Sequence, residues 1–289
     1  MRRSILITGA NGQLGNCLRD LAADFQDQYN FYHTDIDTLD ITDVSQIESF
    51  VQEHPVDIII NAAAYTAVDK AEDDQEAAYR INRDAVRNLA EVARLHHLFL
   101  VHISTDYVFD GHTNSPYKED DTPRPCSVYG SSKLAGEEAM RESGCRGVII
   151  RTSWLYSEYG HNFVKTMLKL GRERESLSVV YDQLGAPTYA GDLAQAILDI
   201  CEQADTIKEV ETLHFANEGS ISWFEFAKSA LEMAHVSCSI MPILTSEYPT
   251  KAKRPPYSLF NLGRIKTKYG VKVPYWRDSL KLIINKLSE

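Results

Sequence analysis

Short apolar runs alternate with longer amphipathic stretches through the first half of the chain. Unbroken apolar runs of this length are typical of strands buried on both faces of a parallel sheet. The pattern therefore predicts strands at residues 4–8, 30–34, 57–61, 98–104 and 147–151.

The stretches between these runs have the three-to-four-residue spacing of amphipathic helices. They predict helices from about residue 12, at 43–53, at roughly 74–95 and at 127–141. Thr42 or Asp43 is suited to cap the second of these helices. Because crossovers between parallel strands are right-handed, this alternation favours a doubly wound, Rossmann-like α/β fold.

The pattern loosens after Trp154, where prolines become frequent. Helices are expected at 162–172, 192–202, 222–234 and 276–287, and short strands at 177–181 and 213–216. We expect one domain over residues 1–154 and a smaller, interleaved C-terminal lobe over 155–289. Some segments of the lobe are expected to return to the first domain.

Composition is that of an ordinary globular protein of 289 residues, with 44% hydrophobic and 25% charged positions. A formal net charge of -11 argues against nucleic-acid binding. No apolar stretch approaches the ~20 residues that span a bilayer, so we expect no membrane association. The five cysteines are scattered without a C-x-x-C pair, which indicates neither a disulfide framework nor a zinc site and favours a cytoplasmic location.

Three glycines directly follow the first predicted strand, where a helix is expected to begin. Gly9, Gly12 and Gly15 are spaced three apart in ITGANGQLG. Such a turn lets a pyrophosphate approach the backbone at a helix N-terminus, and a side chain at Gly12 would block it. The alternative is a glycine-rich turn without a ligand. The chain has no G-x-x-x-x-G-K-[ST] motif for ATP hydrolysis.

A carboxylate about twenty residues past such a turn accepts hydrogen bonds from the adenosine ribose in NAD-binding folds. Asp35 has this position, and Asp37 and Asp40 compete for the role. No basic residue is obviously placed for a 2'-phosphate, so NAD is favoured while NADP stays open. The first domain is therefore predicted to bind a dinucleotide, NADPH or NADH, and the lobe to bind mainly the substrate.

Tyr129 and Lys133 lie four apart in VYGSSK, on one face of a predicted helix. An ammonium beside a phenol favours the phenolate, which lets the pair transfer a proton at a carbonyl or an alcohol. Ser104 and Thr105 end the fourth predicted strand, where ligands bind in doubly wound sheets. Capping of the strand end is the plainer role for these two hydroxyls.

Together these motifs resemble the extended short-chain dehydrogenase/reductases and, more narrowly, the dTDP-4-dehydrorhamnose reductase family. The resemblance is collinear from residue 4 to about residue 262. It is carried by NAAAYTAVDKAE (61–72), STDYVFDG (104–111), VYGSSKLAGE (128–137), RTSWLY (151–156) and DQLGAPT (182–188).

The resemblance implies reduction of the 4-keto group of a dTDP-linked 6-deoxy sugar, in dTDP-rhamnose biosynthesis. It implies that Tyr129 donates the proton, that Lys133 lowers the pKa of Tyr129 and holds the nicotinamide ribose, and that Thr105 bonds the ketone oxygen. Asp106 and Trp154 are expected at the substrate, although a tryptophan buried in the core is the alternative. Arg254 is a candidate for the substrate's diphosphate.

The resemblance also places Gln13 and Leu14 at the pyrophosphate and residues 64–66 beside the cofactor. The full expected cofactor-binding set is Gly9, Gly12, Gln13, Leu14, Gly15, Asp35, Asp40, Ile41, Ala64, Tyr65, Thr66, Tyr129 and Lys133.

Several alternatives stay open. A related branch eliminates water with a Thr-Asp-Glu motif, but Tyr107 stands in place of that glutamate. Some relatives bind Mg between subunits, but Cys17 replaces one acidic ligand, so no metal is expected, and the chain is predicted to be a monomer or homodimer. A non-catalytic regulatory subunit that binds NAD(P), or a reductase of a related dTDP-4-keto-6-deoxy sugar, remains a second interpretation.

Overall fold

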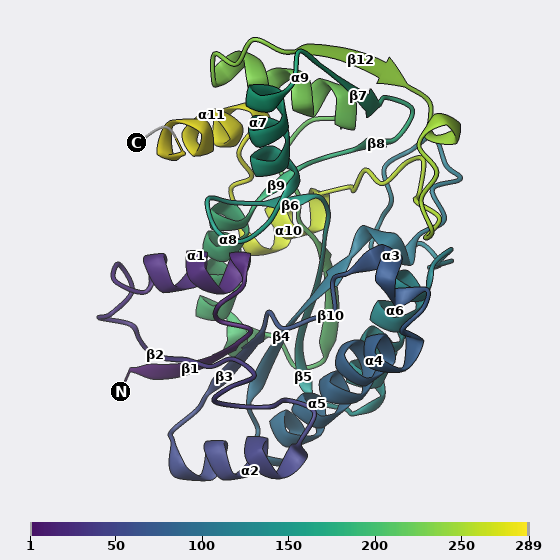
Figure 1. Ribbon diagram of the computed structural model, residues 1–289. Helices are drawn as coiled ribbons and strands as arrows, with labels where there is room; N and C mark the ends of the chain where they lie inside the picture. The colour runs from purple at the N-terminus through teal and green to yellow at the C-terminus, as the bar shows by residue number, and fades with distance from the viewer. Residues whose placement is uncertain (1, 288–289) are drawn as a thin grey trace.

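The computed structural model describes residues 2–287, and its centre is a six-stranded parallel sheet (Figure 1). The strands are β1 (Arg3–Thr8), β2 (Tyr29–His33), β3 (Ile58–Asn61), β4 (Phe99–Thr105), β5 (Arg146–Thr152) and β10 (Val210–His214). Their order is β2-β1-β3-β4-β5-β10, and every neighbouring pair is parallel. The predicted doubly wound fold is confirmed. The order reverses between β1 and β3, which is where such sheets bind ligands.

Helices cover both faces of this sheet. One apolar cluster joins the sheet to α1 (Gln13–Leu21), α8 (Ala190–Glu202) and α10 (Gly263–Tyr269). A second cluster joins the other face to α2 (Val44–Glu53), α5 (Ala85–Leu95) and α6 (Val128–Glu142). Asp43 caps α2 and Ser127 caps α6, each accepting a hydrogen bond from a backbone N–H in the first turn.

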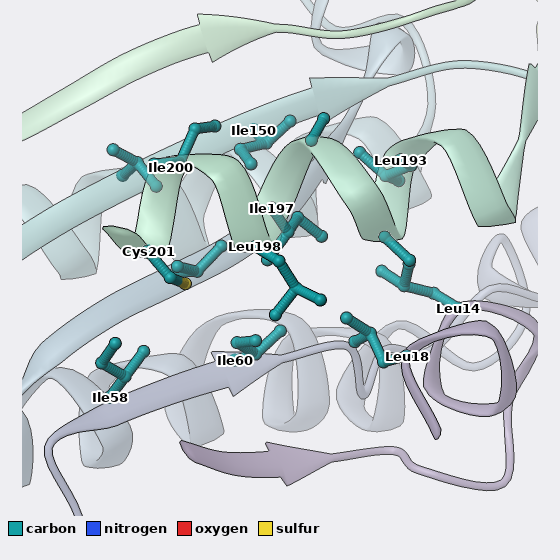
Figure 2. Packing of buried hydrophobic residues seen from close by; sticks show 14 of the residues in the cluster. Leu14, Leu18, Ile58, Ile60, Ile150, Leu193, Ile197, Leu198, Ile200 and Cys201 are labelled. Carbon is teal, nitrogen blue, oxygen red and sulfur yellow. The ribbon is translucent and has the colours of Figure 1, made fainter. Parts of the chain in front are cut away.

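Figure 2 shows how α8 and α1 meet over the middle of the sheet. Side chains of both helices and of the strands form one cluster, and all of them are buried. The labelled residues are Leu14, Leu18, Ile58, Ile60, Ile150, Leu193, Ile197, Leu198, Ile200 and Cys201. Burial of aliphatic side chains contributes about 1.5–3 kcal/mol each. This packing fixes the first turn of α1 at the carboxyl end of β1.

The long helix predicted over 74–95 is interrupted. The structure has α3 (Val68–Ala71) and α4 (Gln75–Tyr79), then a π-helical turn over Arg80–Asp84 that leads into α5. Asn82 in this turn is buried, and its side chain binds the backbone N–H and C=O of Tyr65 and the hydroxyl of Ser132. A β-carbon at Gly136 would lie 2.0 Å from the Asn82 carbonyl oxygen, so α6 packs directly on the widened turn.

The second half of the chain contributes to two regions. Helix α8 and strand β10 join the central sheet, whereas α7 (Phe163–Glu173), α9 (Trp223–Met233) and α11 (Trp276–Lys286) build a separate apolar cluster. Figure 1 shows these three helices at the upper end of the molecule, beside β7 (Ser176–Val180) and β12 (Ser239–Ile243). The division of the chain at residue 154 stays a prediction.

Neither β12 nor α10 was predicted. Strand β12 contains Pro242, which is tolerated because β12 pairs on one side only, with β7. The remaining short elements are η2 (Asp106–Val108), β6 (Leu155–Tyr156), β8 (Leu184–Gly185), β9 (Thr188–Tyr189), η3 (Ala204–Thr206), β11 (Ile221–Ser222) and η4 (Thr245–Glu247). Across residues 2–287, no helix combines the length and apolar character needed to cross a bilayer.

Candidate active site

The glycine turn after β1 brings three backbone segments into contact. Gly9 has a left-handed φ of 66°, and a β-carbon there would lie 2.6 Å from the Ala63 nitrogen. A β-carbon at Gly15 would lie 2.5 Å from the Ala10 Cα. At Gly12, which precedes the first turn of α1, the added atom would meet only the Gly9 oxygen, at 3.2 Å. Gly9 and Gly15 therefore serve packing, whereas Gly12 keeps the helix N-terminus open.

A cavity of about 850 Å³ runs from this turn to the carboxyl ends of β4 and β5. Most residues expected at the site line it: Gly9, Gly12, Gln13, Leu14, Asp35, Asp40, Ile41, Ala64, Thr66, Thr105, Asp106, Tyr129, Lys133 and Trp154. Gly15, Tyr65 and Arg254 are not among its lining residues. Its volume is within the range of pockets that hold cofactors, so the cavity can accommodate a dinucleotide.

Tyr129 and Lys133 share one face of α6 and line the cavity beside Thr105. The Thr105 hydroxyl lies beside the Tyr129 hydroxyl and donates to the Asp106 carboxylate, at 3.0 Å. The Lys133 Nζ donates to the backbone oxygen of Ile103, at 2.6 Å, and Lys133 is 2% exposed. Two hydroxyls and an ammonium thus converge at the end of β4.

Lys133 was expected to lower the pKa of Tyr129, but in the structure this pKa is raised. Burial raises the pKa of Tyr129, and the hydrogen bond to Thr105 offsets part of this effect. Burial also lowers the pKa of Lys133 to about 8, because its ammonium is removed from water. Tyr129 is therefore a neutral phenol at neutral pH in this structure, which suits a proton donor.

Asp106 lies at the centre of the same wall and is 2% exposed. Burial raises its pKa to about 6, although hydrogen bonds to the side chains of Ser258 and Thr105 act in the opposite direction. A buried carboxyl group that is bonded to the Thr105 hydroxyl, next to Tyr129, is well placed to bind a polar ligand.

The acidic loop after β2 is arranged around the glycine turn. Asp35 accepts hydrogen bonds from the backbone N–H of Asn11 and of Ile36, both at 2.8 Å. Asp40 accepts from the N–H and the hydroxyl of Thr42. Both carboxylates line the cavity, whereas Asp37 is not one of its lining residues. Asp35 and Asp40 are therefore the acids that could meet an adenosine ribose.

Trp154 lines the cavity with an unusual backbone conformation, at a φ of 47°. Its ring stacks on Trp223 with 3.6 Å between centroids and 12° between planes. A β-carbon at Gly185 would lie 2.6 Å from the same ring, so Gly185 leaves room for it. The indole is held in place from two sides although it is only partly buried.

Arg254 and Tyr65 lie beside the cavity. Arg254 donates to the Tyr107 hydroxyl, at 3.1 Å, and to Asp69, at 2.9 Å, and it lines a separate cavity of about 440 Å³. Sequence reasoning did not assign a role to Tyr107, Trp223 or Ser258. Tyr107 follows Thr105 and Asp106 directly and could have been found there, but Trp223 and Ser258 come from distant segments with no local signal.

Comparison with known proteins gives a consistent result. The family described as "RmlD substrate binding domain" matches residues 1–289. A protein of Aggregatibacter actinomycetemcomitans named dTDP-4-dehydrorhamnose reductase is 42% identical, over 96% of this chain and 97% of its own length. One of Sinorhizobium fredii with the same name is 37% identical, over 97% and 96%.

Solved structures agree with these sequences. The crystal structure of dTDP-4-dehydrorhamnose reductase from Bacillus anthracis in complex with NADP has a TM-score of 0.94. It is 42% identical and covers 99% of this chain and 100% of its own.

Proposed function

The chain belongs to the RmlD substrate binding domain family, and on this basis we propose that it reduces the C4 ketone of dTDP-4-dehydro-L-rhamnose to dTDP-L-rhamnose with NADPH or NADH. The observation that carries the proposal is the meeting of Thr105, Tyr129 and Lys133 in the cavity that begins at the glycine turn. A reductase needs a proton donor at the ketone and a dinucleotide site beside it.

The residues around the glycine turn fit a dinucleotide. Gly12 leaves the N-terminus of α1 open to a pyrophosphate, and Gln13 and Leu14 follow it along the same wall. Asp35 and Asp40 would accept hydrogen bonds from the adenosine ribose, with Ile41 and Thr66 lining the cavity beside them. The cofactor supplies the hydride for the ketone carbon when it is bound. The relative from Bacillus anthracis, which is described in complex with NADP, supports the use of a nicotinamide dinucleotide.

Tyr129 donates a proton to the C4 oxygen as negative charge develops there. The Thr105 hydroxyl, which donates to Asp106 in this structure, turns to donate to the same oxygen, and because it lies beside the Tyr129 hydroxyl, both groups address one point. Lys133 keeps a positive charge close by, which stabilises the phenolate after proton transfer. Asp106 and Trp154 bind the sugar, and Arg254 remains a candidate for the diphosphate.

The proposal also covers the cellular location, the substrate class and the assembly of the protein. Its five cysteines are all free thiols, which is typical of the reducing cytoplasm. The substrate is a nucleotide sugar, and the assembly is proposed to be a monomer or a homodimer.

The decisive experiment mixes the protein with dTDP-4-dehydro-L-rhamnose and either NADPH or NADH, and follows nicotinamide absorbance. We expect oxidation of one or both cofactors, with dTDP-L-rhamnose as the product by chromatography. Related dTDP-4-keto-6-deoxy sugars serve as comparison substrates. No oxidation with either cofactor, by protein that binds NADPH, would favour a non-catalytic role.

A further inference from the structure

A carboxylate that the proposed mechanism does not use lies one helical turn beyond Lys133. Glu137 of α6 is 0% exposed. Its Oε1 accepts from the Ser104 Oγ at 2.6 Å and the Arg151 Nε at 2.9 Å. Its Oε2 accepts from the Arg151 Nη2 at 2.7 Å and the Arg141 Nη2 at 3.1 Å. A buried carboxylate that accepts four hydrogen bonds from three side chains is held in one geometry.

Two of these contacts lead straight to the reacting groups. Ser104 immediately precedes Thr105, so the Glu137–Ser104 bond ties α6 to the last residues of β4. The Lys133 Nζ binds Ile103 on the same strand, at 2.6 Å. Successive turns of α6 therefore hold successive residues of β4, and this double attachment sets where Thr105 stands relative to Tyr129.

Charge gives Glu137 a second connection to the site. Lys133, Arg141 and Arg151 place three cations around it, and Glu137 is the carboxylate that bonds both arginines. Burial of Glu137 alone would raise its pKa, but Arg151, Ser104 and Arg141 together outweigh this effect and lower the pKa, so the group stays ionised. Its negative charge in turn raises the pKa of Lys133, against the larger effect of burial.

Other titratable groups face Lys133 as well. Tyr129 lies one turn earlier on the same helix, and His102 approaches from β4. Burial and the charge of Lys133 lower the pKa of His102 well below its usual value, so His102 is neutral and adds no further positive charge beside Lys133. Among the titratable groups of residues 2–287 that shift the pKa of Lys133, Glu137 is the one whose charge favours the ammonium.

We propose that Glu137 is a positioning residue for the reaction: it lies one turn from Lys133 on α6 and fixes the end of β4 through Ser104, and so holds Thr105 and Lys133 in place beside Tyr129. The inference rests on the proposed function, because it assigns Glu137 a part in that chemistry. Glu137 touches neither substrate nor cofactor in this role and acts through Ser104 and Lys133.

The test is Glu137→Gln, which keeps the size of the side chain and removes its charge. Without the carboxylate, the Lys133 ammonium is neutralised at lower pH. We expect kcat to fall by about tenfold or more at pH 8, and the alkaline limb of its pH profile to move about one unit lower. NADPH affinity, measured by fluorescence titration across pH, should weaken at correspondingly lower pH, because the family resemblance implies that Lys133 holds the nicotinamide ribose.

Arg141→Gln is the matched control. It removes one hydrogen bond to the same carboxylate but leaves the charge of Glu137 and its bonds to Ser104 and Arg151. We expect its alkaline limb not to move to lower pH. A Glu137→Gln protein with wild-type kcat and wild-type pH dependence of NADPH binding would overturn the proposal.

Loss of the partner of Arg151 could prevent Glu137→Gln from folding, so a second variant is needed. Ser104→Ala removes one bond to Glu137 without leaving a buried charge. The proposal requires a lower kcat in this variant. Where Glu137→Gln folds, the proposal also requires that adding Ser104→Ala to it lowers kcat little further. Unchanged kcat in Ser104→Ala would contradict it. If the wild-type protein fails to reduce the sugar, the proposed function fails, and the NADPH titrations still test the effect of Glu137 on Lys133.

Discussion

The ring of Tyr107 meets the ring of Tyr129 edge to face, with 5.4 Å between centroids and 76° between planes. The Tyr107 hydroxyl accepts a hydrogen bond from Arg254, so the proposed proton donor is braced by a residue that is itself tied to the C-terminal part of the chain. Gly130 lets α6 approach the Tyr107 backbone, because a β-carbon there would lie 2.2 Å from the Tyr107 carbonyl oxygen. The two phenols share one wall of the cavity but differ in role: Tyr129 is the proposed proton donor, and Tyr107 supports its ring.

This difference can be measured with two matched substitutions. Tyr129→Phe removes the proposed proton donor, and we expect kcat to fall by about 10²–10⁴ with NADPH affinity unchanged. Tyr107→Phe keeps the ring contact and loses only the bond from Arg254, so its kcat should fall by less than about tenfold. Equal losses in the two variants would remove the special role of Tyr129.

The raised pKa of Asp106 predicts that the protein loses stability as pH rises. Its pKa is about 6 in the folded protein, against an ordinary value of 3.8, so the folded state binds the proton more tightly than the unfolded state. The free energy of unfolding therefore decreases as pH rises from about 4 to about 6, by up to about 3 kcal/mol from this group.

Asp106→Asn should remove that cost. We expect its Tm to exceed that of the wild type by about 5 °C at pH 8, and to match it near pH 4. Thermal melts across pH measure this, with Asp27→Asn as the control, since Asp27 is fully exposed. A wild-type Tm at pH 8 in Asp106→Asn would mean that the buried carboxyl is solvated more fully than its surroundings indicate.

Gly12 and Gly15 should respond differently to the same added methyl group. Gly12→Ala adds an atom whose one close neighbour is the Gly9 oxygen, at 3.2 Å, so the protein should fold and lose NADPH affinity by more than about tenfold. Gly15→Ala forces an atom to 2.5 Å from the Ala10 backbone and should lower the free energy of unfolding by about 2 kcal/mol. Fluorescence titration and denaturant melts separate the two effects.

The Trp154–Trp223 stack should control sugar binding without affecting the cofactor. Trp154 has a positive φ, which costs about 1–3 kcal/mol, and Trp223 supplies the face that holds it there. We expect Trp223→Leu to raise KM for the nucleotide sugar several-fold with NADPH affinity unchanged, and Trp223→Phe to restore most of the loss. A weakened NADPH affinity in Trp223→Leu would place the stack at the wrong end of the cavity.

Local spacing was sufficient for the features that depend on one strand and one helix. The glycine turn, the pairing of Tyr129 with Lys133 and the five strands of the first half each follow from neighbouring residues. The predicted fold class is confirmed. A chain in which apolar strands alternate with amphipathic helices can adopt few arrangements.

Features that depend on distant segments were not accessible in this way. Trp223 supports Trp154 across 69 positions of sequence, and nothing in either segment indicates their contact. The π-helical turn at Asn82 reflects packing against Gly136 and hydrogen bonds to Tyr65, which override a regular helical pattern. The spacing of Tyr129 and Lys133 predicted a lowered pKa for Tyr129, whereas burial raises it in the structure. The burial of a single side chain cannot be inferred from spacing alone.

Strand β10 completes the sheet more than fifty residues after β5, the neighbour with which it pairs. During synthesis, the edge of β5 therefore stays unpaired until residue 214 has left the ribosome, and α8 must arrive before one face of the sheet is covered. Exposed strand edges promote association between nascent chains. A fragment ending near residue 154 would keep both exposures permanently, so we expect it to aggregate instead of folding into a working dinucleotide-binding unit.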